Sequence, residues 1–279
     1  MKYSMNTSSF YTQASKHIKL AAFDLDGTLL DSQRSLTPAA KKAVACLQQK
    51  GIYVVLVTGR SYSAVKPIYD QLGLHAPIVC YNGAGVVNGD DGAMIHSLLL
   101  PDHLTRGVIQ IARRHNVHVH VFISDRMYYE KERKEAWDYE KQLGIKGTLV
   151  PFDEMKDLNV LKALCIADHE ILQQVSRDIG NAYGENITRV FSYPHFLEVM
   201  DGRVNKVEGL KAVSRQYGIS RDEMIAFGDG ENDIEMLRYA GIGIAMENAY
   251  EHVKEAADLI TASNDEEGIT KSLKSLGLL

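Results

Sequence analysis

Several features that would place this chain of 279 residues in a special class are missing from its sequence. It has only three cysteines (Cys46, Cys80 and Cys165), an odd number, far apart and set in apolar surroundings. This spacing argues against a disulfide or cysteine-based metal framework and predicts free thiols of a reducing compartment. No apolar run reaches the length of a membrane span. The composition, 45% hydrophobic and 24% charged, also contains no biased tract that would indicate disorder.

A large charge of either sign is missing too. The formal net charge of -5 gives no reason to expect a nucleic-acid or membrane-surface partner. Residues 1–17 are polar and lack the apolar segment of a signal peptide, so we expect a flexible N-terminal extension there. These observations predict a soluble, cytoplasmic protein. The length allows one large domain or two modest ones.

Apolar runs alternate with helical segments in the first part of the chain. Each expected helix is bounded by a capping residue or glycine, such as Thr37-Pro38 at one start and Gly51 after one end. The order strand–helix–strand–helix–strand predicts the beginning of a doubly wound parallel sheet. The segments are strands at 18–23, 52–57 and 77–81 and helices at 37–50 and 61–73.

The pattern changes after Tyr81. Two short apolar runs flank the turn sequence Asn88-Gly89-Asp90-Asp91-Gly92, which indicates a hairpin instead of a helical crossover. A helix at 101–116 and an alternating strand at 117–121 follow, and the α/β rhythm resumes with a helix at 206–217. We therefore predict an α/β protein with a Rossmann-like core formed by residues 18–83 and 203–279 and interrupted by an inserted α+β domain at 84–202.

Two carboxylates, Asp24 and Asp26, follow the first apolar strand and precede a Gly-Thr turn. Because side chains alternate along a strand, residues two apart can point to the same side. Open α/β sheets place their chemistry at the carboxyl ends of their strands. Such a pair can divide the work of a nucleophile and a general acid/base. The alternative is a strand that ends in a solvated acidic turn.

A second acidic cluster has the same arrangement, with Asp229 and Asp233 after an apolar strand in the segment Gly228-Asp229-Gly230-Glu231-Asn232-Asp233. Carboxylates four residues apart at the start of a helix can converge on one Mg²⁺, which prefers one or two carboxylates, waters and phosphate oxygens. The alternative is an acidic helix N-cap favoured by the helix dipole.

Two further elements are ambiguous alone. Lys206 stands at a predicted helix start, where most lysines are solvated. Thr58-Gly59 offers a hydroxyl and a backbone N–H at a strand end, which is a common combination. The combination is more informative than its parts. The first Asp pair, Thr58-Gly59, Lys206 and the second acidic cluster occur in this order, each at or next to a predicted strand end or helix start.

In these motifs the sequence resembles the haloacid dehalogenase-like phosphohydrolases, and among them the Cof-type phosphatases. The resemblance covers the whole chain apart from the N-terminal extension, and the 206 − 58 = 148 positions between Thr58 and Lys206 place the inserted domain as in Cof-type proteins. The matching stretches are Asp24-Leu25-Asp26-Gly27-Thr28, Thr58-Gly59-Arg60, Tyr81-Asn82-Gly83-Ala84, Val204-Asn205-Lys206, Gly228 to Asp233, Ala240 to Met246 and Ser263 to Gly268.

The resemblance implies a role for each motif residue. Asp24 would be the nucleophile that forms an aspartyl-phosphate, and Asp26 the general acid/base. Mg²⁺ would be held by Asp24, Asp229, the main chain of Asp26 and Asp233. The phosphate would be bound by Asp24, Thr58, Gly59, Lys206 and Asn232, with Asn232 orienting the Asp cluster or the lysine. The inserted domain would be a cap that sets specificity for a small phosphate monoester, such as a sugar phosphate or a phosphorylated cofactor.

Two other functions remain open at this point. A phosphohexomutase of the same superfamily shares a similar cap and Asp pair, and it would isomerise a sugar phosphate without releasing phosphate. A catalytically silent sensor of a phosphorylated ligand would not need Asp24 or Asp26. In the inserted domain, His118 and His120 share one face of a strand. They are interpreted as a solvated or substrate-facing pair, with a zinc site as the alternative.

Overall fold

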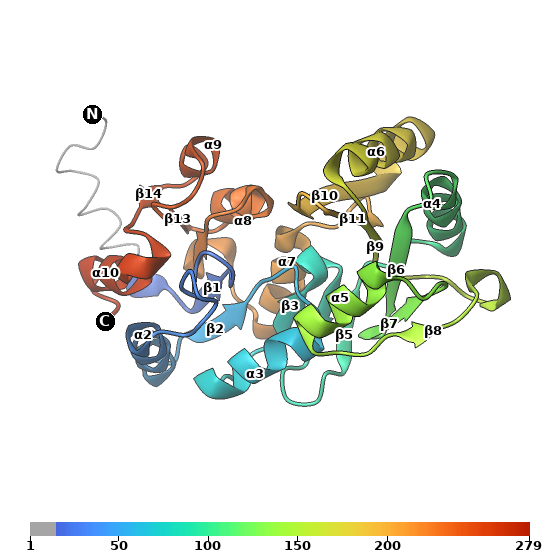
Figure 1. Ribbon diagram of the computed structural model, residues 1–279. Helices are drawn as coiled ribbons and strands as arrows, with labels where there is room; N and C mark the ends of the chain where they lie inside the picture. The colour runs from blue at the N-terminus through green and yellow to red at the C-terminus, as the bar shows by residue number, and fades with distance from the viewer. Residues whose placement is uncertain (1–14) are drawn as a thin grey trace. The chain divides into compact units, whose positions relative to one another are not determined.

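The computed structural model describes residues 15–279, which form two units (Figure 1). The first unit contains the described residues up to Arg60 together with Val65–Ile95 and Asn205–Leu279. The second contains Ser61–Ala64 and His96–Val204. The chain therefore leaves the first unit and returns to it.

The N-terminal extension was expected to be flexible as far as residue 17. Its residues up to 14 lie outside the described part of the chain. The remaining three form a 3-10 turn, η1 (Ser15–His17), and Ser15 is buried and donates a hydrogen bond of 2.7 Å from Oγ to the carbonyl of Leu276. The end of the segment is therefore fixed to the first unit, which corrects the expectation for residues 15–17.

The first unit is built on a five-stranded sheet whose strands are all parallel. Apolar residues on both faces of its inner strands explain why the sheet is covered by helices on both sides. Strand β1 pairs with β12 on one side and β2 on the other, so its carboxyl end lies between theirs. The order is β14 (Leu259–Ile260), β13 (Ile242–Ala245), β12 (Met224–Gly228), β1 (Leu20–Phe23) and β2 (Tyr53–Leu56).

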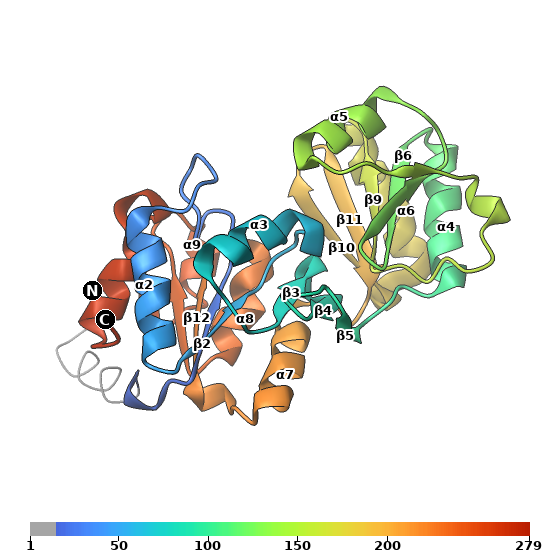
Figure 2. The same cartoon turned by 90° about the horizontal axis from the view of Figure 1, so that it is seen from below.

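Helices cover both faces of this sheet. In Figure 2, α2 and α10 lie on one side of it and α7 and α8 on the other. Thr37 caps α2 as predicted, since its hydroxyl accepts a hydrogen bond of 3.1 Å from the N–H of Ala40. The helices are α2 (Pro38–Gln49), α3 (Tyr62–Leu72), α7 (Lys206–Tyr217), α8 (Ile234–Tyr239), α9 (Glu251–Lys254) and α10 (Gly268–Ser275). Short 3-10 turns are η5 (Arg221–Glu223), η6 (Glu231–Asp233) and η7 (Asn264–Glu266).

The predicted hairpin is present, but it belongs to a small sheet of order β3-β4-β5. Its strands are β3 (Ile78–Cys80), β4 (Gly85–Val87) and β5 (Met94–Ser97), with the 3-10 turn η2 (Tyr81–Gly83) after β3. Because β4 pairs antiparallel with β3, the hairpin as far as Ile95 is part of the first unit and not of the inserted one. The expected boundary at residue 84 is therefore about ten residues too early.

The second unit contains a six-stranded sheet with helices α4 (Asp102–Arg114) and α6 (His169–Tyr183) on one face. Apolar residues of these helices, such as Val108 and Leu172, pack against the odd-numbered valines of β6. Its strands pair antiparallel at β10–β11, β11–β9, β9–β6 and β6–β7, and β7 pairs parallel with β8. The order is β10 (Ile187–Tyr193), β11 (Phe196–Asp201), β9 (Lys162–Ile166), β6 (His118–Ile123), β7 (Arg126–Tyr129) and β8 (Thr148–Leu149). The remaining elements are α5 (Lys134–Leu143), η3 (Phe152–Glu154) and η4 (Gly184–Asn186).

The histidines of β6 share one face as predicted, but they are neither solvated nor substrate-facing. His118 is 4% exposed and His120 0%, because α5 covers this face of the sheet. Their rings are 4.6 Å apart, and the ring of His120 lies 5.1 Å from that of Tyr139 on α5. Neither is part of an acidic, histidine or cysteine cluster suited to a metal within the described residues, so the zinc alternative gains no support.

These buried histidines should make the folding of the second unit sensitive to acid. Burial lowers the pKa of His118 to about 4 and of His120 to about 3. An exposed histidine titrates near pH 6.5, so below that pH the unfolded chain binds more protons than the folded one. Stability should be complete above about pH 6.5 and fall as the pH decreases, by on the order of 3 kcal/mol per histidine.

Urea unfolding between neutral pH and about pH 4 measures this effect. His120→Phe should remove about half of the acid-dependent loss, because it deletes one titrating group and keeps an aromatic ring in the cluster. The same change at the exposed His103 is the control and should leave the pH profile as in the wild type. If the free energy of unfolding of His120→Phe falls with decreasing pH as steeply as that of the wild type, His120 is not a source of the acid sensitivity.

Two observations bear on the wider expectations. The cysteines Cys46, Cys80 and Cys165 are free, and burial raises the pKa of Cys165 to about 12. Among the described residues, no helix has both the length and the apolar character needed to cross a bilayer.

Candidate active site

Asp24 and Lys206 form the centre of the site. Asp24 follows the buried strand β1, is 7% exposed, and donates its N–H to the carbonyl of Phe227 on the neighbouring strand β12. Lys206 is the first residue of α7, which Asn205 caps through its side chain. The lysine Nζ lies 2.5 Å from Oδ1 of Asp24 and 2.6 Å from Oδ1 of Asp233. Its side chain is fully buried, so the solvated interpretation of this lysine is wrong.

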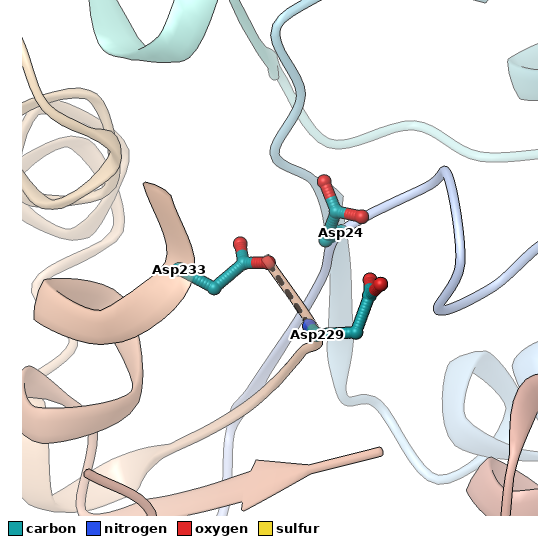
Figure 3. Close-up of side chains that lie close together, drawn as sticks. All are labelled: Asp24, Asp229 and Asp233. Carbon is teal, nitrogen blue, oxygen red and sulfur yellow. Dashed lines mark hydrogen bonds between the residues drawn. The ribbon is translucent and has the colours of Figure 1, made fainter. Parts of the chain in front are cut away.

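The second acidic cluster is folded around Asp233. Its Oδ2 accepts hydrogen bonds from the N–H groups of Asp229 (3.0 Å) and Gly230 (2.9 Å), the first of which is the dashed line in Figure 3. A β-carbon at Gly228 would lie 2.4 Å from that of Asp233, so the tight turn requires glycine there. Asp233 does cap the turn, but its second oxygen faces Lys206, so the capping interpretation and the functional one hold together.

Three carboxylates converge at this end of the sheet. Oxygens of Asp24, Asp229 and Asp233 lie within 4.8 Å of one another, and no other such cluster occurs among residues 15–279 (Figure 3). Three carboxylates and the one ammonium of Lys206 give a formal charge of minus two. This excess of buried negative charge and the all-oxygen donor set suit a hard divalent cation such as Mg²⁺.

The protonation equilibria reflect that excess. Burial raises the pKa of Asp24 well above its usual range, and Asp233 and Asp229 add to the effect, although Lys206 opposes it. Burial also raises the pKa of Asp229 to about 6, although the hydrogen bond of 2.7 Å that the Thr28 hydroxyl donates to this carboxylate lowers it. The pKa of Lys206 is raised although burial opposes this, because Asp233 and Asp24 outweigh burial. Lys206 therefore keeps its positive charge at neutral pH.

Asp26 lies outside this group of carboxylates. Its side chain is 40% exposed and pairs with Arg60, whose Nε and Nη2 donate hydrogen bonds of 2.8 and 2.5 Å to the two carboxylate oxygens. The interpretation of Asp26 as part of a simply solvated turn is therefore incomplete. Arg60 is part of the matching stretch Thr58-Gly59-Arg60, but no role was predicted for it from the sequence. A bidentate arginine pair fixes the direction of a carboxylate more firmly than solvent does.

Thr58 and Asn232 are joined through a residue that the sequence did not assign. Thr58 is 1% exposed, and its hydroxyl accepts a hydrogen bond of 3.2 Å from the N–H of Arg60. Its carbonyl accepts from the N–H of Asn82, whose side chain in turn accepts from Nδ2 of Asn232 at 2.8 Å. Asn232 was expected to orient the Asp cluster or the lysine, but the structure pairs it with Asn82.

The loop that follows Asp26 is held by two asparagines from the C-terminal part of the chain. Nδ2 of Asn248 donates to the carbonyl of Gly27 at 2.9 Å, and Nδ2 of Asn264 donates to that of Leu30 at 2.9 Å. The N–H of Asn264 also donates to Oδ1 of Asn248. Sequence reasoning missed both residues as parts of the site. For Asn264 the signal was the loop Ser263 to Gly268, which contributed to the resemblance without a stated role, whereas no matching stretch contains Asn248.

The geometry can now be set against known proteins. A family model of haloacid dehalogenase-like hydrolases matches residues 21–273. The chain belongs to this family. It is 33% identical over 259 residues to the 5-amino-6-(5-phospho-D-ribitylamino)uracil phosphatase YitU of Bacillus subtilis, with 91% of this chain and 96% of that protein covered.

Solved haloacid dehalogenase-like structures have the same fold. A haloacid dehalogenase-like hydrolase from Bacteroides thetaiotaomicron superposes with a TM-score of 0.83 at 30% identity, covering 92% of this chain and 98% of that one. The subclass IIB sugar phosphatase BT4131 superposes with a TM-score of 0.81 at 26% identity, covering 94% and 100%. Within the family the chain is an enzyme of the Cof-type phosphatase branch, as the order of its motifs implied. The catalytically silent sensor is therefore set aside.

Proposed function

We propose that this phosphatase hydrolyses small phosphate monoesters with Mg²⁺ and passes through an aspartyl-phosphate on Asp24. The observation that carries the proposal is the convergence of the Asp24, Asp229 and Asp233 carboxylates at the carboxyl end of the parallel sheet, where Asp24 and Asp233 also hold Lys206. A buried lysine held by two carboxylates is an expensive arrangement to fold. Its position at the strand ends, where open α/β sheets bind ligands, supports a catalytic purpose.

Mg²⁺ fits the donor set. Asp24 and Asp229 would hold it with carboxylate oxygens and Asp26 with its main-chain carbonyl. Asp233 belongs to the same cluster of carboxylates, could supply a further oxygen, and fixes the turn that carries Asp229. When bound, the cation neutralises the charge of the carboxylates and of the substrate phosphate so that an anionic nucleophile and an anionic ester can approach each other.

The reaction divides into two displacements. In the first, a carboxylate oxygen of Asp24 bonds to phosphorus, the bond from phosphorus to the ester oxygen breaks, and Asp26 gives its proton to that oxygen. In the second, Asp26 takes a proton from water, the water oxygen bonds to phosphorus, and the bond between phosphorus and Asp24 breaks. Inorganic phosphate leaves, and both aspartates return to their starting states.

Four groups around Asp24 would bind the phosphoryl oxygens. Lys206 carries the positive charge, the Thr58 hydroxyl and the Gly59 N–H supply neutral donors, and the side-chain amide of Asn232 supplies another. Donors that are already fixed where negative charge develops stabilise the transition state without reorganising. Burial of Thr58 and Lys206 supports this role, because buried side chains have few alternative positions.

We propose a sugar phosphate or a phosphorylated cofactor or its precursor as the substrate. A relative of this chain is named for 5-amino-6-(5-phospho-D-ribitylamino)uracil, and a structural neighbour is named a sugar phosphatase. A first panel should therefore include that pyrimidine together with hexose and pentose phosphates. We also propose a cytoplasmic location, which the three free cysteines support.

Removing the metal tests the proposal. Purified protein should release phosphate from p-nitrophenyl phosphate or from a member of the panel with Mg²⁺, and chelation by EDTA should lower the rate at least about 100-fold, restored by Mg²⁺. A rate that EDTA leaves unchanged contradicts the metal requirement. Conversion of a hexose phosphate to its isomer without free phosphate contradicts hydrolysis and favours the phosphohexomutase.

A further inference from the structure

The turn after β3 has an uncommon backbone. Its three residues all have positive φ, with 53° at Tyr81, 56° at Asn82 and 100° at Gly83. Each non-glycine residue in this region costs on the order of 1 kcal/mol, and asparagine tolerates it better than most. Tyr81 and Asn82 are also 1% and 4% exposed. Strained backbone of this kind persists only where its surroundings hold it, and it is concentrated at functional sites.

Asn82 connects two separate parts of the active site. Its N–H donates to the carbonyl of Thr58 at 2.9 Å, and its Oδ1 accepts from Nδ2 of Asn232, which is 150 positions away in the chain, at 2.8 Å. Its amide also lies against Gly59, where a β-carbon would be 3.0 Å from Oδ1 and 3.2 Å from Nδ2.

We propose that Asn82 is a positioning residue that sets the orientation of the Asn232 amide toward the substrate phosphate. One hydrogen of the Asn232 nitrogen is used by Asn82, which leaves the second for a phosphoryl oxygen. Without Oδ1 of Asn82 as acceptor, the Asn232 amide can rotate by half a turn. Its oxygen would then face the phosphate oxygens, and the partially negative amide oxygen and the phosphate would repel each other. The left-handed turn brings Asn82 into this place, and the hydrogen bond to Thr58 fixes it there. This inference rests on the proposed function.

The decisive experiment is a double-mutant cycle with Asn82→Gly and Asn232→Ala. Glycine removes the side chain but accepts a φ of 56° without cost, so the melting temperature should stay within a few degrees of the wild type. Each single variant should lower kcat/KM about 10- to 100-fold, as expected for the loss of one hydrogen bond to a charged group. Because Asn82 acts through Asn232, the double variant should lose no more than the greater of the two single losses.

A second measurement separates positioning from general loosening of the site. Inorganic phosphate should inhibit the two single variants and the double variant equally weakly, because all three lack the same oriented donor. Asn116→Gly is the matched control, since Asn116 has a φ of 55° and lies in the second unit, and it should keep kcat/KM within about two-fold.

Two outcomes overturn the inference while leaving the proposed function in place. One is an Asn82→Gly variant with wild-type kcat/KM. The other is a double variant whose loss equals the product of the single losses, because independent effects on free energy add. A wild-type protein that releases no phosphate from any ester of the panel would overturn the proposed function itself.

Discussion

Asp24→Asn should lower phosphate release by at least about 10⁴-fold, because an amide cannot replace the attacking carboxylate. The variant should nevertheless fold as well as the wild type or better. Burial raises the pKa of Asp24, and Asp233 and Asp229 add to this rise against the opposing effect of Lys206, so the ionised form of Asp24 opposes folding at neutral pH. Asparagine removes that charge and keeps an oxygen that accepts from Lys206. Single-turnover phosphate release and a thermal melt measure both effects.

Two further variants frame this result. Asp26→Asn should slow turnover strongly, about 100- to 10⁴-fold, since the leaving oxygen and the water then lack their proton donor and acceptor. Asp31→Asn is the matched control in the same loop, where Asp31 accepts hydrogen bonds from the N–H groups of Gln33 and Ser35. It should stay within about two-fold of the wild type. An Asp24→Asn variant with more than a tenth of wild-type activity contradicts the assignment of the nucleophile.

Lys206→Met should destabilise the first unit by about 3–5 kcal/mol in the absence of metal, since it leaves two buried carboxylates without their counterion. Methionine has a similar length but no charge, so the loss reports electrostatics more than packing. Activity should fall at least about 10³-fold with it. Added Mg²⁺ should restore part of the stability, because the cation neutralises the same carboxylates. Urea unfolding with Mg²⁺ and with EDTA measures this dependence.

The second unit offers a matched control. Lys162 is 3% exposed and forms an ion pair of 2.9 Å with the buried Glu198. Lys162→Met should destabilise the protein to a similar degree, because it also removes the lysine that neutralises a buried carboxylate. Mg²⁺ should not reverse that loss. If Mg²⁺ stabilised both variants equally, the cation would be acting generally, and the role of Lys206 as counterion of a metal cluster would be wrong.

The elements of the fold could be predicted from the sequence because they depend on local patterns. The helix predicted at 206–217 coincides with α7, and the alternating residues at 117–121 gave β6 and the shared face of His118 and His120. Which surface covers that face could not be predicted, since α5 packs on it through contacts across the chain. The hairpin after Tyr81 was likewise recognised, but its pairing with β3 depends on a neighbouring strand, not on its own sequence.

The same distinction applies to the site. Asp24, Lys206, Asp229 and Asp233 were recognised because each follows a strand or begins a helix, and the structure brings all four together. The partners that orient the site were not. Asn232 contacts Asn82 across 150 positions, and nothing local in either segment specifies that pairing. The stretch Tyr81-Asn82-Gly83-Ala84 contributed to the resemblance, but such a match does not show what the Asn82 side chain will contact.

The central claim is that Asp24 carries the phosphoryl group during turnover, and trapping that intermediate tests it most directly. Asp26→Asn should slow its hydrolysis more than its formation when the leaving group needs no protonation, as with p-nitrophenolate. The variant, mixed with p-nitrophenyl phosphate and Mg²⁺ and quenched in acid, should show one added phosphoryl group on the peptide that contains Asp24. The double variant Asp24→Asn/Asp26→Asn should show no added phosphoryl group on that peptide. Phosphoryl transfer to another residue, or turnover in Asp26→Asn with no trapped group at any time, would contradict the account.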